Sequence, residues 1–151
     1  MGHALLAVVA PKPINTQAAA ELDLTVLDGG THVIVPLYHR HLDAWTEKLG
    51  LAFEHHSQII GDTPVLQHFA KVMGLTTYSL VQTEYFGGTG TQFATVWESG
   101  VRTMPAKVGN GVINSALERI GVVPRDGKDA FDTIGLGTYR DGSVYFESYW
   151  D

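Results

Sequence analysis

Residues 76–98 constrain the fold of this chain more than any other segment, because they combine two strand-forming arms with a glycine-rich reversal. Aromatic and β-branched residues fill both arms, as is typical of β-strands. Gly87, Gly88 and Gly90 lie between the arms and supply the positive-φ conformations that a tight turn requires. We therefore predict a β-hairpin with its structural turn at residues 87–90.

The same glycines also have to be weighed as a phosphate-binding loop. A P-loop requires a Lys followed by Ser or Thr after its glycines, and a dinucleotide-binding loop opens a helix. Here the chain continues from Gly90 into Thr91, Gln92 and Phe93, which is a strand-like sequence. We therefore interpret the glycine cluster as a hairpin turn.

The remaining chain shows strand and helix patterns that do not alternate strictly, which favours an α+β fold over a doubly wound α/β fold. A non-alternating apolar run at residues 3–10 predicts a strand that is buried on both faces. Residues 1–151 are expected to form a single α+β domain, with a mainly antiparallel sheet of four to five or more strands packed against about three helices. Further strands are predicted at residues 24–27, 32–37 and 143–150, and helices at residues 16–23, 39–49, 63–73 and 112–120.

Composition excludes several classes of function. The chain has no cysteine, so disulfides, cysteine-ligated metals and a thiol nucleophile are excluded. A formal net charge of −6, with basic residues scattered singly, argues against binding to nucleic acid. The apolar run at residues 4–10 is too short to span a bilayer and lacks the basic start of a signal peptide. We therefore expect a cytoplasmic protein that makes no membrane contact.

Polar residues within the hairpin arms are the first candidates for chemistry. If Glu84 and Gln92 lie on one face of the sheet, together they can bind a ligand, and a carboxylate among aromatics can act as an acid or base. The alternative is that Glu84 is satisfied within the structure, paired with an Arg or with backbone N–H groups, as buried polar groups usually are. Both interpretations are open from the sequence.

Histidines are numerous, but their spacing predicts no metal site. His39 and His41 are two residues apart and diverge on a helix, and the neighbouring His55 and His56 diverge in any regular element. The sequence also contains no nucleophile-elbow serine and no zinc-binding H-E-x-x-H helix. We therefore assign no metal, no cofactor and no catalytic residue.

Three passages resemble a family of small bacterial proteins that are similar to immunity proteins of contact-dependent toxin systems. The passages are residues 82–92, 113–122 and 131–140, and the resemblance covers residues 75–141. It implies a small acidic partner that neutralises a secreted toxin, and it carries no catalytic residues that can be transferred to this chain.

Two functional hypotheses follow, together with a structural one. The first is a protein-binding module, an immunity protein that occludes a cognate and basic toxin. The second is a small hydrolase or ligand-binding enzyme with a site around Glu84, Gln92 and one histidine. The third is an oligomerisation module that pairs through a strand edge at residues 145–150. For the first hypothesis, aromatic anchors and steering charges point to the partner-binding residues Glu84, Tyr85, Asp132, Tyr139, Tyr149 and Trp150.

Overall fold

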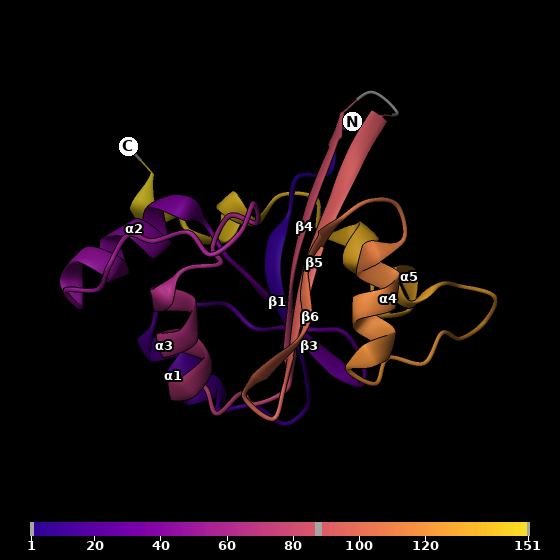
Figure 1. The fold of residues 1–151 in the computed structure, drawn as a ribbon, viewed down its shortest axis with the longest axis horizontal. Coiled ribbons are helices and arrows are strands. Elements are labelled where there is room, and N and C mark those ends of the chain that lie inside the picture. The colour runs from indigo at the N-terminus through magenta and orange to yellow at the C-terminus, as the bar shows by residue number, and fades with distance from the viewer. Residues whose placement is uncertain (1, 87–88, 151) are drawn as a thin grey trace.

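In the computed structural model, which describes residues 2–86 and 89–150, six antiparallel strands form one sheet between two layers of helices (Figure 1). The strands are β1 (Leu6–Pro11), β2 (Leu27–Asp28), β3 (His32–Pro36), β4 (Tyr78–Phe86), β5 (Thr89–Glu98) and β6 (Val101–Val108), and their spatial order is β2-β3-β1-β4-β5-β6. The α-helices are α1 (Thr16–Glu21), α2 (His39–Lys48), α3 (Pro64–Val72), α4 (Val112–Arg119) and α5 (Ala130–Thr133). Helices α1, α2 and α3 lie on one side of the sheet, and α4 and α5 lie on the other. The predicted α+β class with a single domain is confirmed.

Burial on both faces of the sheet follows from its two helical layers. In β1, Val8 belongs to the core beneath α1–α3, whereas Ala7 and Val9 belong to the core beneath α4 and α5. Strand side chains alternate between faces, so an unbroken apolar run supplies both cores at once. The predicted double burial of this strand is confirmed.

Helix α3 shows how local signals define an element. Pro64 occupies the first helical position, where its missing N–H costs nothing. Leu66, Phe69 and Met73 are fully buried, as their spacing predicts, and Gly74 ends the helix with a φ of +75°. Helices α1, α2 and α4 likewise form where the sequence predicts them.

The predicted hairpin is present as β4 and β5, whose register places Tyr85 opposite Gly90. A Cβ atom added to Gly90 would lie 1.8 Å from the Tyr85 ring, so the lack of a side chain at this position makes room for the ring. Because it pairs with Tyr85, Gly90 lies within β5 rather than in the turn. The turn residues Gly87 and Gly88 lie outside the described residues.

The predicted closing strand at residues 143–150 is wrong. This segment forms two 3₁₀ turns, η2 (Gly142–Tyr145) and η3 (Glu147–Tyr149). The Asp141 carboxylate accepts a hydrogen bond from the Ser143 N–H and caps the first turn. Phe146 and Tyr149 are three residues apart, so a helical turn directs both rings towards α2, whereas a strand would separate them.

Strand β6 is absent from the sequence prediction. Pro105 lies in its middle and lowers its strand propensity, but a proline is tolerated on an edge strand because no neighbour needs its N–H. No helix in the described part of the chain is long and apolar enough to cross a membrane.

Candidate functional site

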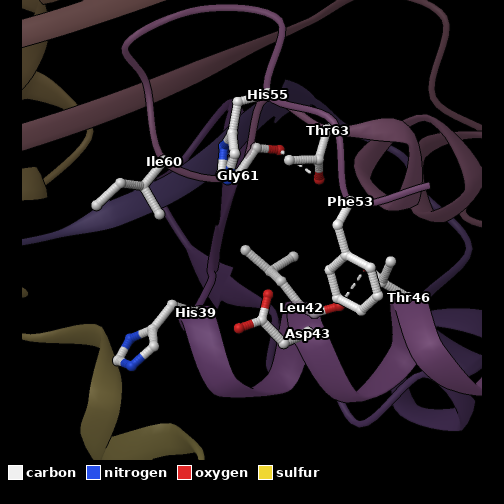
Figure 2. Close-up of a pocket in the computed structure, with 9 residues that line it drawn as sticks. All are labelled: His39, Leu42, Asp43, Thr46, Phe53, His55, Ile60, Gly61 and Thr63. Carbon is white, nitrogen blue, oxygen red and sulfur yellow. Dashed lines mark hydrogen bonds between the residues drawn. The ribbon is translucent and has the colours of Figure 1, made fainter. Parts of the chain in front are cut away.

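A long loop over residues 49–63 connects α2 and α3 and contains no helix or strand. Connections of this length within a compact domain are uncommon, and many of them form binding surfaces or lids. In this protein the loop lies beside α2 and encloses a cavity (Figure 2). We therefore take the long loop and its cavity as the candidate functional site.

Buried polar contacts hold the long loop in place. Asp62 is fully buried, and its Oδ1 atom accepts a hydrogen bond from Arg102 Nη2 on β6 at 2.8 Å. Its Oδ2 atom accepts from Ser57 Oγ at 2.7 Å, within the loop itself. The Ile60 N–H donates to Gln82 Oε1 on β4 at 2.8 Å. The loop is therefore tied to two strands by hydrogen bonds, one of them between charged groups.

The Arg102 side chain is itself fixed in position. Its guanidinium lies over the Trp97 ring at 4.3 Å, and Nη1 donates to Thr95 Oγ1 at 2.7 Å. Trp97 in turn stacks on Tyr78 with ring centroids 4.7 Å apart. Burial raises the pKa of Tyr78 to about 12, so its hydroxyl keeps its proton and donates to Gln67 at neutral pH. The cation that pairs with Asp62 therefore rests on a packed aromatic platform.

The cavity beneath the long loop has a volume of about 190 Å³ and combines apolar and polar walls. Leu42 on α2 forms part of the wall, and Phe53 and Ile60 from the loop line the cavity on opposite sides (Figure 2). Phe53 is 61% exposed and Ile60 is 44% exposed. Asp43 contributes a carboxylate to the same wall, one position after Leu42. The site is thus a hollow of mixed apolar and polar lining, with a negative group on its wall.

A second cavity of about 200 Å³ adjoins the first, because His39 and Ile60 line both. It lies between Leu6 on β1 and the capping residue Asp141 of the C-terminal segment. Gly61 lies against core side chains: its φ is +90°, and an added Cβ would be 3.3 Å from Leu6. We call the two cavities together the loop groove.

The polar groups of the loop groove do not form a metal site. Within residues 2–86 and 89–150 there is no group of three or more His, Asp or Glu side chains placed to hold a metal ion. His39 and Asp43 are one turn apart on α2, and His55 lies across the cavity on the long loop. No hydrogen bond joins these three side chains in the described part of the chain.

The condition for a joint site at Glu84 and Gln92, that both side chains lie on one face of the sheet, is not met. The hairpin register places Gln92 opposite Thr83 and Glu84 opposite Thr91, so the two side chains are on opposite faces of the sheet. Glu84 is exposed and accepts a hydrogen bond from Gln82 Nε2 at 3.1 Å. Gln92 Oε1 accepts from the Ile113 N–H in the first turn of α4, which is a structural role.

The six predicted partner-binding residues are divided between the two sides of the sheet. Glu84 shares its face with Gln82 and Leu80, on the side of α1–α3. Tyr149 lies on this side as well, where its hydroxyl donates to Asp23 and its ring contacts α2, and Trp150 follows it. The side of α4 and α5 carries the other three residues, Tyr85, Asp132 and Tyr139.

Sequence reasoning missed Phe53, Ile60, Asp43 and the ion pair between Asp62 and Arg102. A signal was present, since residues 50–62 separate two periodic helices and hold apolar residues without a helical or strand period. The ion pair joins residues forty positions apart and has no local signature.

Comparison with known proteins adds no relative: no family model matches the chain, and no curated protein or solved structure gives a significant match.

Proposed function

We propose that this protein is a protein-binding module that receives part of a partner protein in the loop groove. The observation that carries the proposal is the exposure of Phe53 and Ile60 on a loop that a buried ion pair holds in place. Exposed apolar side chains on a fixed loop have no role in the core. They are the kind of group that anchors a protein interface.

The restraint on the long loop supports binding for a thermodynamic reason. A flexible loop loses conformational freedom when it binds, and that loss reduces affinity. Asp62, Gln82 and Arg102 have already ordered this loop in the free protein. More of the contact energy of Phe53 and Ile60 is therefore available to the complex.

The charge of the protein favours a basic partner. The net charge is −6, and the loop groove has the carboxylates of Asp43 and Asp141 on its walls. Complementary charge increases the rate of association and disfavours acidic competitors. Tyr149 and Trp150 lie on the same side of the sheet and can extend the interface beyond the groove.

The specific role that we propose is that of an immunity protein, which neutralises a basic toxin by covering its active surface. This role rests on the resemblance of residues 75–141 to proteins of toxin systems, and the carboxylates of the loop groove are compatible with it. We propose accordingly that the protein acts by occlusion and has no catalytic activity of its own.

Co-expression with the product of a toxin gene adjacent to its own tests this proposal. The wild-type protein should restore growth, and the double variant Phe53→Asp/Ile60→Asp should fail to restore it while remaining folded. Val123→Asp is the matched control, since Val123 is 65% exposed and lies between α4 and α5, on the other side of the sheet. Equal rescue by all three proteins would refute the loop groove as the interface, and a lack of rescue by the wild type would refute the immunity role.

A further inference from the structure

A second pocket lies away from the loop groove and has the opposite charge. Arg125 and Lys128, from the loop between α4 and α5, line it together with Gly29, Gly30 and Thr31 from the turn between β2 and β3. Its volume is about 210 Å³. We call it the basic pocket, and we propose that it binds a small phosphate-bearing anion.

The two cations of the basic pocket stand out in an acidic protein. Three other basic side chains form ion pairs: Lys12 with Asp28, Arg102 with Asp62 and Arg119 with Glu98. Within the described residues, the side chains of Arg125 and Lys128 have no ion pair and no hydrogen bond, and Asp126, which lines the same pocket, offsets one of their two charges. Two unpaired cations facing one pocket raise the local concentration of anions there.

The hydroxyl of Thr133 adds a directed donor. Its Oγ1 atom accepts a hydrogen bond from the Arg125 N–H at 3.1 Å, which fixes the hydroxyl at the wall of the pocket. Within the described residues the Thr133 hydroxyl donates to no acceptor, so its proton is available to an oxygen of the ligand. A guanidinium, an ammonium and a hydroxyl together match the several acceptor oxygens of a phosphate group.

A hydroxyl acceptor is also built into the basic pocket. The buried His32 donates from Nε2 to the Ile120 carbonyl at 2.9 Å, so in the neutral ring Nδ1 accepts from the Thr31 hydroxyl at 2.7 Å. The lone pairs of the Thr31 oxygen then remain to accept a proton from the ligand. A phosphate group that retains one P–OH can donate to them, whereas a fully deprotonated anion such as sulfate cannot.

The turn between β2 and β3 provides a wall without side chains. Gly29 lies against the Ile134 carbonyl, where an added Cβ would be 3.1 Å from its oxygen. Gly30 has a φ of +90° and open space beside it. A ligand can therefore approach this turn closely, although the Gly29 and Gly30 N–H groups already donate to the His32 carbonyl and the Asp28 carboxylate and do not bind it. The pocket is below the volume of typical drug-sized sites, so the expected ligand is one phosphate group with little attached to it.

Titration with inorganic phosphate at constant ionic strength tests the proposal, with amide chemical shifts of the ¹⁵N-labelled protein as the readout. The expected result is saturable shifts at Gly30, Thr31 and Gly127. Arg125→Gln and Lys128→Gln should each weaken binding about tenfold or more, because each removes charge-assisted hydrogen bonds. Lys107→Gln removes the same charge from an exposed position on β6 and should bind as the wild type does.

The choice of anion separates a built site from a general attraction. Sulfate and acetate at the same ionic strength should bind more weakly than phosphate, and glycerol 3-phosphate should bind at least as well if the natural ligand is a phosphorylated molecule. Equal shifts with acetate and phosphate, or equal binding by Arg125→Gln and the wild type, would overturn the proposal. The test is independent of the protein partner, since it involves neither the loop groove nor a toxin.

Discussion

Replacing Arg102 with Met should destabilise the protein severely, because it leaves the carboxylate of Asp62 buried without its cation. Met retains an unbranched stem that can still cover Trp97, so the change mainly removes the guanidinium. The Ser57 hydroxyl remains as the only side-chain donor to Asp62 in the described part of the chain. The perturbation therefore isolates the charge that holds the long loop.

The size of the effect follows from the burial of the pair. Breaking a buried ion pair by removing one partner costs about 3–5 kcal/mol. Asp62 is fully buried but the Arg102 side chain is 30% exposed, which places this pair near the lower end, at about 3 kcal/mol. For a domain of this size each kcal/mol lowers the Tm by about 2–4 °C, so the expected decrease is about 6–12 °C.

Urea unfolding and thermal melts of a double-mutant cycle measure this coupling. Asp62→Asn keeps the shape of the side chain and removes its charge, so Arg102→Met/Asp62→Asn should be more stable than Arg102→Met alone. Hydrogen exchange at the Ile60 amide reports whether the long loop has loosened, because this amide donates to Gln82. A loss below about 1 kcal/mol in Arg102→Met, or a double variant no more stable than that single variant, would refute the role of the ion pair.

Three further predictions concern the core, the site and the hairpin. Burial lowers the pKa of His41, whose Nδ1 atom has no partner in the described residues, while the nearby Asp23 opposes the shift. Its folded pKa is below the unfolded value of 6.5, so the free energy of unfolding should be greatest above that pH and should fall by up to about 1.4 kcal/mol per pH unit below it. Urea titrations at several pH values test this prediction. An equally steep fall in His41→Gln would contradict it. Phe69→Ala should lower the free energy of unfolding by about 3–5 kcal/mol because Phe69 is fully buried. Phe53→Ala should change it by less than about 0.5 kcal/mol and weaken only partner binding. Similar losses of stability in the two variants would be inconsistent with an exposed anchor. Gly90→Ala should lower the free energy of unfolding by about 1–3 kcal/mol because the new methyl group meets the Tyr85 ring. In thermal melts, Tyr85→Ala/Gly90→Ala should recover part of this loss. No recovery would mean that the ring is not the obstacle.

Local patterns predicted most elements of this fold because their signals lie within a few residues. The proline at the start of α3, the glycine at its end and the spacing of its apolar residues are all short-range features. The same reasoning failed at residues 143–150, where an aromatic-rich segment is compatible with both a strand and a turn. It failed at β6 because an edge position tolerates Pro105, and an edge position is a property of the sheet rather than of the segment.

The candidate site was less predictable because its parts come from distant segments. Composition and spacing singled out Glu84 and Gln92, yet the register of a single hairpin separated them onto opposite faces. The loop groove depends on Asp62 meeting Arg102, and the basic pocket on Gly29–Thr31 meeting Arg125, and neither contact has a sequence signature.

The amino-acid sequence alone determined the α+β class, the two-sided burial of β1 and the acidic, cysteine-free character of the protein, because periodicity and composition act locally or additively. Only the tertiary structure decided which polar side chains are partners, which apolar residues remain exposed and where charges converge. Those outcomes depend on strand order and on contacts between residues far apart in the chain, and hydrophobic periodicity specifies a buried face without specifying what covers it.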